Sequence, residues 1–540
     1  MSYTSLNFAL FVCITALVYF LFPVKKYQWT VLLAASYVFY LFVGYKHAFF
    51  LLFTTVSVYA TALVIDRIAA RGQAQLKAHK EDWDKAEKKA FRSHIKQKKR
   101  IVMLLSVIVN LAILCFLKYY NFLAGSLNDL LGAGGLRFSA PTLKLLLPLG
   151  ISFYTFQAVG YVLDVYNEKV QAERNVFKFA LFVSFFPQIV QGPISFYSQL
   201  AHQLYEPHRF EYPRVKHGCE LILWGVFKKL VIADRALIAI NAVLNQYSGF
   251  GGTTLTFTIL LYALQLYTDF SGGIDISRGV AQIFGIDLVQ NFKRPYFATD
   301  INDYWRRWHI SLGAWMKEYV FYPLALSKRF AALSKKIKTS RFGSTPAGTH
   351  VARVLPTSIA SLIVFLLVGA WHGANWKYIG FGLWNGGVIM LSTLMEPLFV
   401  KLAEKLHINV KTMAFRLFQM LRTFLIVLVG YVFDVAPTLG DALHSLWMML
   451  TRQNFAAAGV EIASLGLTNQ DYWLLGICTL FLLVVSILQE RSGGVSLREK
   501  LDQKPFILRY ALLFVGILAI VIFGIYGPGY DPADFVYMQF

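Results

Sequence analysis

The chain has 540 residues, of which 56% are hydrophobic and 15% are charged, and its formal net charge is +22. Soluble domains carry about 25% charged residues, so this composition and the recurring apolar runs exclude a soluble globular protein and indicate an all-α, polytopic membrane protein. The Lys and Arg residues gather between the apolar runs. This distribution orients a membrane protein and attracts anionic lipid, so the charge does not support nucleic-acid binding.

Neither a disulfide framework nor a metal site is expected from the four cysteines. They are far apart in the sequence and form no CxxC pair: Cys13, Cys115, Cys219 and Cys478. The N-terminal apolar run has no basic start and no small-residue cleavage site, so we expect a first membrane span rather than a removable signal peptide.

Apolar runs close to the ~20 residues that cross a bilayer predict the membrane spans, roughly 11–14 helices in all. We expect these helices to form a single membrane domain over residues 1–540. The predicted spans, in chain order, are 5–23, 28–44, 47–65, 101–118, 142–163, 176–195, 218–243, 253–270, 354–372, 376–396, 413–433, 472–489 and 507–526.

Two basic segments set the predicted orientation. Residues 66–100 hold 12 Lys/Arg against five Asp/Glu, and their composition predicts a solvated amphipathic helix. Residues 328–353 hold seven Lys/Arg and no acid. Both segments should lie in the cytoplasm by the positive-inside rule. The alternation of spans then places the N-terminus and the tail, Gly527–Phe540, on the other side of the membrane.

A broken or re-entrant segment is expected between Ser271 and Pro323, because the two ends of this stretch must lie on opposite sides. The pair Gly272-Gly273 predicts the break, and such a segment is tolerated only where protein or water surrounds it. Asp269 and Asp275 flank the glycines. They are expected either to line an aqueous cavity or to cap the broken helix.

Two tryptophan-rich stretches carry the candidate catalytic residues, His309 within 303–312 and His372 within 368–376. An ionisable side chain at membrane depth is costly and therefore suggests a functional site. A neutral imidazole can accept a proton from an attacking hydroxyl, which makes His372 a candidate general base. Gly369 and Gly373 should let another backbone or a ligand come close to it. The alternative is an aromatic belt at the lipid–water boundary.

His309 is a candidate for orienting the acceptor or stabilising an oxyanion. Its stretch also resembles an interfacial amphipathic helix, in which Arg306 and Arg307 would pair with lipid headgroups rather than with a substrate phosphate. The residues expected to line a substrate path are Trp371, Asn375, Trp305, Arg306, Asp269 and Asp303. No metal is expected, because the histidines lack metal-ligand spacing.

The sequence resembles the membrane-bound O-acyltransferase family in four blocks. These are Phe185–Ile194, Tyr267–Asp275, the segment from Arg294 through 305–312 to Pro323, and Trp371–Trp376. The resemblance extends over about residues 1–400, and over the last quarter mainly by hydropathy. Within the family the chain is most similar to the bacterial branch that O-acetylates alginate, cellulose and other exported polysaccharides. The D-alanyl transfer protein of teichoic acids is a close cousin.

The resemblance implies a ring of helices around a central tunnel, open to an acyl donor on one side and an acceptor on the other. His372 matches the family's near-invariant histidine and His309 its second one, within a catalytic segment over residues 294–400. Two departures concern the acceptor. The chain reads 323–327 Pro-Leu-Ala-Leu-Ser where a Gly-Gly turn is usual, and Asn385-Gly386 where His-Gly is usual.

The predicted function is transfer of an acyl group, acetyl for the bacterial branch, from a cytoplasmic thioester to an extracytoplasmic hydroxyl. Acetyl-CoA or another thioester would be a donor substrate, and no bound cofactor is expected. The resemblance implies a polysaccharide acceptor, an extracytoplasmic partner protein and a multi-pass location in the cell membrane. The alternatives are D-alanyl transfer from a carrier protein, a transporter or flippase with charged groups spread over several spans, and a non-catalytic scaffold.

Overall fold

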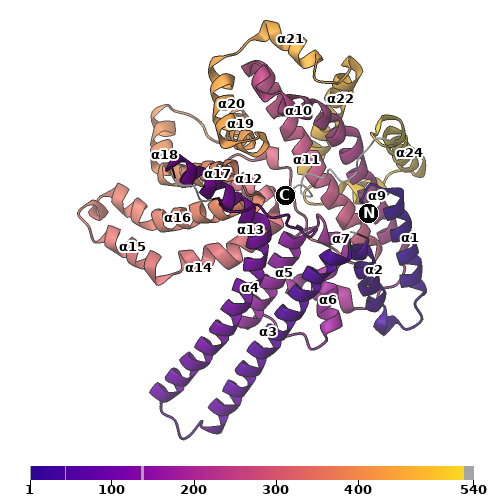
Figure 1. The fold of residues 1–540 in the computed structure, drawn as a ribbon. Coiled ribbons are helices and arrows are strands. Elements are labelled where there is room, and N and C mark those ends of the chain that lie inside the picture. The colour runs from indigo at the N-terminus through magenta and orange to yellow at the C-terminus, as the bar shows by residue number, and fades with distance from the viewer. Residues whose placement is uncertain (1, 43, 136–138, 528–540) are drawn as a thin grey trace. The chain divides into compact units, whose positions relative to one another are not determined.

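The computed structural model describes residues 2–42, 44–135 and 139–527, and within these ranges all regular secondary structure is helical (Figure 1). Of the predicted outer tail, Gly527–Phe540, only Gly527 is among the described residues. The α-helices are α1 (Leu6–Leu21), α2 (Trp29–Leu41), α3 (Tyr45–Ala78), α4 (Lys85–Ala133), α5 (Ile151–Tyr166), α6 (Val176–Ser184), α7 (Phe186–Ile189), α8 (Tyr197–Tyr205), α9 (Tyr212–Val226), α10 (Asp234–Asn245), α11 (Gly252–Ile283), α12 (Ile301–Arg307), α13 (Ile310–Met316), α14 (Tyr322–Ala325), α15 (Lys328–Lys338), α16 (Pro346–His372), α17 (Trp376–Leu394), α18 (Glu396–Lys405), α19 (Met413–Val435), α20 (Leu439–Thr451), α21 (Phe455–Ala463), α22 (Asn469–Glu490), α23 (Leu497–Asp502) and α24 (Phe506–Phe523). Two π-helical segments, Phe227–Ala233 and Lys317–Phe321, are continuous with neighbouring α-helices.

Among the residues that the structure describes, six helices are long and apolar enough to cross a membrane: α3, α4, α16, α19, α22 and α24. The bent pair α17 and α18, whose axes differ by 58°, would make a seventh if it is one span. This helical architecture confirms the predicted all-α, multi-pass membrane protein. The ring of helices around a tunnel stays a prediction.

The chain divides into two compact units, which are described separately. The first unit comprises Met1–Ile222 and Ile276–Val289, and the second comprises Leu223–Asp275 and Gln290–Phe540. Both candidate histidines lie in the second unit, and so do all six residues expected to line a substrate path.

In the first unit, α3 and α4 form a long antiparallel hairpin (Figure 1). The sequence predicts one solvated helix over 66–100, but the structure has two helical arms and a turn. The turn ends at a capping box: the Asp84 carboxylate accepts from the Glu87 N–H at 2.6 Å, and the Glu87 carboxylate accepts from the Asp84 N–H at 2.8 Å. A capping box starts a new helix, so each arm of the hairpin is the polar extension of a candidate span.

The span predicted over 176–195 is interrupted. Helix α6 ends at Ser184, Phe185 has φ −47° and ψ 109°, and the four-residue helix α7 then contains Pro187. Proline has no N–H to continue an α-helical ladder and its ring clashes with the preceding turn, so the hydrophobic run does not make one helix. Hydropathy alone therefore overestimated this span.

The helix break predicted at Gly272-Gly273 is wrong, because α11 continues through both glycines to Ile283. The structure gives Gly272 a different role. A Cβ atom built there would lie 2.9 Å from the carbonyl oxygen of Gly225, so the missing side chain lets α9 approach α11 closely. Asp269 and Asp275 consequently lie within a continuous helix, and neither caps a helix end.

Candidate active site

His372 is the last residue of α16, and its side chain is buried. The chain turns sharply after it, and α17 runs back along α16. The turn depends on two glycines. A Cβ at Gly369 would lie 2.2 Å from the Tyr378 carbonyl oxygen, and one at Gly373 would lie 2.1 Å from Cε2 of the Tyr378 ring. Gly369 therefore allows the close backbone approach that the sequence predicts, and Gly373 makes room for the ring of the same residue, Tyr378.

Asn375, expected to line a substrate path, serves in the structure as the N-cap of α17. Its Oδ1 accepts from the Lys377 N–H at 3.0 Å, and its Nδ2 donates to the Pro437 carbonyl at 3.4 Å. An N-cap satisfies backbone donors that the first helical turn leaves unpaired. This geometry explains the asparagine as a structural residue that begins α17.

His309 lies in the turn between α12 and α13 with φ +45°, the left-handed region that is uncommon for residues other than glycine. Asn291 holds the next two residues in place: its carbonyl accepts from the Ile310 N–H at 3.0 Å and its Oδ1 accepts from the Ser311 N–H at 2.7 Å. The His309 side chain is only 2% exposed. Burial, and with it the nearby His372, lowers the pKa of His309 well below its usual range, which favours the neutral imidazole.

Trp371 connects the two histidines. Its ring centroid lies 5.7 Å from that of His309 and 5.3 Å from that of His372, both in edge-to-face geometry. On its other side, His309 meets the ring of Phe270 at 4.8 Å. The structure therefore brings together two histidines that are 63 positions apart in the sequence, with one of the predicted tryptophans between them.

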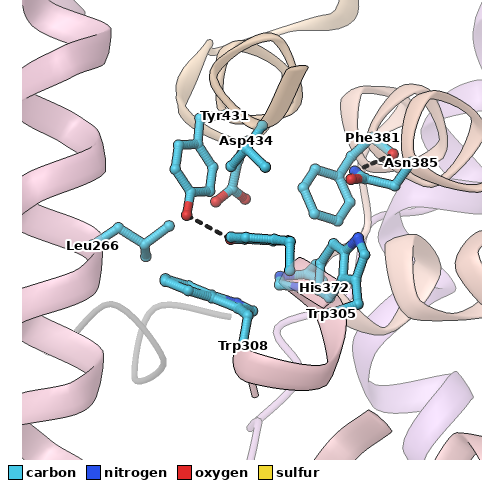
Figure 2. A pocket seen from close by; sticks show the side chains of 10 residues that line it. Leu266, Trp305, Trp308, His372, Phe381, Asn385, Tyr431 and Asp434 are labelled. Carbon is cyan, nitrogen blue, oxygen red and sulfur yellow. Dashed lines mark hydrogen bonds between the residues drawn. The ribbon is translucent and has the colours of Figure 1, made fainter. Parts of the chain in front are cut away.

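A small cavity of about 10 Å³ borders His372, which is room for about one water molecule. Figure 2 shows Tyr431 and Asp434 on one side of the cavity, Trp308 opposite, and Phe381 with Asn385 alongside. The lining comes from α11, α12, α16, α17 and α19 and the residue after α12, and consists of Leu266, Tyr304, Trp305, Trp308, His372, Phe381, Asn385, Val427, Tyr431 and Asp434.

Two tyrosines and one carboxylate of the cavity wall, Tyr304, Tyr431 and Asp434, are hydrogen-bonded to one another or to tyrosines behind the wall. The hydroxyl of Tyr431 is 2.7 Å from that of Tyr304 and 3.2 Å from that of Tyr296. The Tyr262 hydroxyl donates to Oδ2 of Asp434 at 2.8 Å. The other carboxylate oxygen of Asp434, Oδ1, is buried and has no hydrogen-bond partner among the described residues. An acceptor for a hydroxyl donor is therefore available in the wall that His372 also borders.

Three other predicted lining residues are not part of this cavity wall. Asp303 pairs with Arg307 one helical turn later, at 3.0 Å, and Arg306 is exposed on α12. Asp269 is fully buried, but it belongs to a different polar cluster. Of the six predicted lining residues, only Trp305 borders the cavity itself.

Asp269 belongs to a lysine–aspartate network, defined as Lys228, Lys229, Asp234, Asp269 and Asp275. The Lys229 ammonium lies 2.6 Å from the Asp269 carboxylate and 2.9 Å from that of Asp234, and Lys228 lies 2.7 Å from Asp275. Both lysines are in the π-helical segment Phe227–Ala233. Buried charged groups therefore also occur away from the histidines, so charge distribution alone does not argue against a transporter.

Several polar residues of the cavity were not predicted from the sequence. Tyr431 and Asp434 lie about 60 residues beyond His372, and Asp434, which directly follows the predicted span 413–433, is in the last turn of α19. Asn385 is only 2% exposed and borders the cavity, at one of the two positions where the sequence departs from the family it resembles. The departure from the family pattern at Asn385 was the one sequence feature that could have pointed to this position.

The fold is that of an integral membrane protein, and its small cavity is bordered by a histidine and a carboxylate, His372 and Asp434. The sequence model of the MBOAT, membrane-bound O-acyltransferase family, matches residues 173–339. A probable alginate O-acetylase of Pseudomonas aeruginosa is 30% identical over 451 residues, covering 82% of this chain and 75% of that protein. The chain belongs to the membrane-bound O-acyltransferase family and is an acyltransferase.

Two further relatives act on other cell-wall polymers, according to their names. A peptidoglycan O-acetyltransferase of Helicobacter pylori is 32% identical over 382 residues, which cover 64% of each chain. A teichoic acid D-alanyltransferase of Bacillus subtilis is 28% identical over 264 residues, covering 47% of this chain and 61% of that protein. The O-acetyltransferases thus match a longer part of this chain than the D-alanyltransferase does.

Proposed function

We propose that this protein transfers an acetyl group from a cytoplasmic thioester to a hydroxyl of an exported or cell-wall polysaccharide. The family and the longer matches to O-acetyltransferases support this activity. The observation that carries the proposed mechanism is the position of His372, buried at the end of a candidate span beside a cavity that also presents a free carboxylate oxygen of Asp434.

In the proposed reaction, His372 is the general base. Its imidazole takes the proton of the acceptor hydroxyl as that oxygen attacks the thioester carbonyl. The new C–O bond forms, the C–S bond breaks, and the proton passes to the leaving thiolate. Base catalysis of this kind contributes about 10²–10⁴-fold to a rate.

His309 and Asp434 have supporting roles in this proposal. A buried, neutral His309 can donate a hydrogen bond to the developing oxyanion without the cost of holding a charge in the protein interior. Oδ1 of Asp434 accepts a hydrogen bond from a hydroxyl of the acceptor and so orients it toward His372. Both roles depend on groups held in fixed positions before the substrate arrives, which is how orientation lowers a barrier.

The donor in this proposal is acetyl-CoA, which enters from the side of the basic segments 66–100 and 328–353. The acceptor is reached on the opposite side of a bacterial cell membrane, with a partner protein that hands the acyl group to the glycan. The D-alanyltransferase relatives make a carrier-bound D-alanyl thioester the second candidate donor.

The test compares His372→Ala with His309→Ala and with His444→Ala, a control on an exposed position of α20. Purified protein in liposomes receives acetyl-CoA on one side and an alginate oligosaccharide or a peptidoglycan fragment on the other, and mass spectrometry measures the acetyl esters. We expect His372→Ala to lose about 10²–10⁴-fold in rate, His309→Ala to lose less, and His444→Ala to match the wild type.

A correctly folded His372→Ala protein with a normal rate would overturn the assignment of the base. Use of a D-alanyl carrier thioester where acetyl-CoA fails would select the second donor. Glycan that crosses the membrane unmodified, with no thioester consumed, would contradict acyl transfer to these acceptors.

A further inference from the structure

A second site lies far from the histidines in sequence, in the first unit. A groove of about 520 Å³ runs between the polar arms of α3 and α4 and the end of α5. Its volume is within the range of about 300–1,000 Å³ that small-molecule sites occupy. All the residues that line it belong to the first unit, so it is complete within that unit.

The groove wall is strongly basic. Arg92, Lys96 and Lys99 follow one another at four and three residues along α4, a spacing that places them on one helix face. Arg92 and Lys96 are exposed, whereas Lys99 is 6% exposed. Against these three cations the lining has a single carboxylate, that of Glu168.

An ion pair between Lys99 and Glu168 lies within the lining of the groove. The Lys99 ammonium lies 2.5 Å from the Glu168 carboxylate and 5.8 Å from the centre of the Tyr166 ring. Glu168 has φ +61° because it ends α5: its N–H donates to the Val165 carbonyl at 3.1 Å, and the next N–H, that of Lys169, donates to the Asp164 carbonyl at 2.9 Å. This C-cap fixes the backbone at the point where the Glu168 carboxylate meets Lys99.

We propose that this groove binds the phosphate ester of an anionic ligand. The guanidinium of Arg92 offers two parallel donors to phosphate oxygens, and Lys96 adds a point charge on the same side, while the charge of Lys99 is already paired with Glu168. Gln73 and Asn167 in the lining supply neutral amide donors. The chemistry fits two sources, an anionic phospholipid headgroup and the phosphates of a soluble nucleotide.

The position of the groove relative to the candidate spans makes both sources accessible. It borders the parts of α3 and α4 in which the apolar residues of the spans give way to charged ones. Lys and Arg near a membrane surface attract anionic lipid, and the same residues face the aqueous phase from which a nucleotide would come. This proposal does not depend on acyl transfer at His372.

The test uses the full chain purified in neutral detergent. Native mass spectrometry measures the affinity for phosphatidylglycerol and for adenosine 3′,5′-bisphosphate, with phosphatidylcholine as the neutral lipid. The groove variant is Arg92→Glu/Lys96→Glu. The control, Lys89→Glu/Lys98→Glu, makes the same change of charge at exposed positions of α4 that do not line the groove.

We expect the groove variant to bind one of the two phosphate ligands more weakly, on the order of tenfold, and the control to stay close to wild type. Weaker binding of phosphatidylglycerol alone identifies a lipid headgroup, and weaker binding of the bisphosphate alone identifies a soluble phosphate. Equal affinities in groove variant and control, or no binding to the wild type, would overturn the proposal. Should the charge reversal prevent folding, Arg92→Gln/Lys96→Gln with the matched Lys89→Gln/Lys98→Gln gives the same comparison.

Discussion

The second unit contains two clusters of buried polar side chains, and they differ in how completely their polar atoms are paired. In the lysine–aspartate network, the ammonium groups of Lys228 and Lys229 each lie within 2.9 Å of a carboxylate. In the cavity beside His372, Oδ1 of Asp434 and Nε1 of Trp305 are buried with no hydrogen-bond partner among the described residues.

This difference separates two uses of buried polarity. Charges that are paired on all sides hold helices together, and removing one of them leaves its partners unpaired in a medium of low dielectric constant. An unpaired acceptor costs the folded protein about 1–3 kcal/mol, and a substrate hydroxyl can recover that energy on binding. Incomplete pairing, rather than burial itself, therefore distinguishes the candidate active site from the network.

The largest expected effect is on stability, in the network. Lys229→Ala leaves the carboxylates of Asp234 and Asp269 buried without their cation, and breaking a buried pair in this way costs about 3–5 kcal/mol. Chemical unfolding in detergent should show this loss, whereas Lys401→Ala on the exposed face of α18 should unfold like the wild type. If Lys229→Ala unfolds like the wild type, the lysine–aspartate network does not stabilise the fold as proposed.

A smaller effect, on activity, is expected in the cavity. Asp434→Asn keeps an oxygen for the Tyr262 hydroxyl but replaces the free acceptor with a donor, so we expect transfer to slow about tenfold to hundredfold, or roughly 1–3 kcal/mol. Unfolding should be unchanged. Glu404→Gln, an exposed carboxylate-to-amide change on α18, is the control. A normal transfer rate in Asp434→Asn would show that the free oxygen does not contact the acceptor.

The smallest effect is expected at Asn375, next to the cavity in sequence but a helix cap in the structure. Asn375→Ala should destabilise the protein by about 1 kcal/mol through the lost N-cap and leave the transfer rate within about twofold of wild type. Asn375→Ser, which retains a capping oxygen, should restore the stability. A large loss of transfer rate in both variants, without a loss of stability, would instead support the prediction that Asn375 lines the substrate path.

The helical class could be predicted from the sequence because long apolar runs are a local pattern. His372 became a candidate in the same way, as an ionisable group within such a run, and the close approach at Gly369 and Gly373 could be predicted from the glycines themselves. The partners of His372 could not be, because Asp434 comes from a helix about 60 residues away and meets it only through tertiary packing. Burial of Asp434 has no local signature.

The errors also have physical reasons. Two adjacent glycines in an apolar run predict a break when only propensity is considered, but in α11 the contact of Gly272 with the backbone of α9 outweighs that propensity. Asp269 was expected to line a cavity or cap a broken helix, and its ion-pair partner was not predicted because Lys229 lies in a different predicted span. Residues 66–100 contained the capping signal of Asp84 and Glu87, and that signal correctly marks the turn that the composition alone did not show.

The small volume of the cavity has a consequence for how the enzyme is inhibited. Space for about one water molecule cannot hold an acetyl thioester and a sugar hydroxyl together, so binding requires side chains of the cavity wall to move apart. The affinity of a competitive ligand is then its intrinsic affinity reduced by the fraction of molecules that are open. A compound that stabilises the open arrangement of these side chains would gain affinity without a single additional contact to His372.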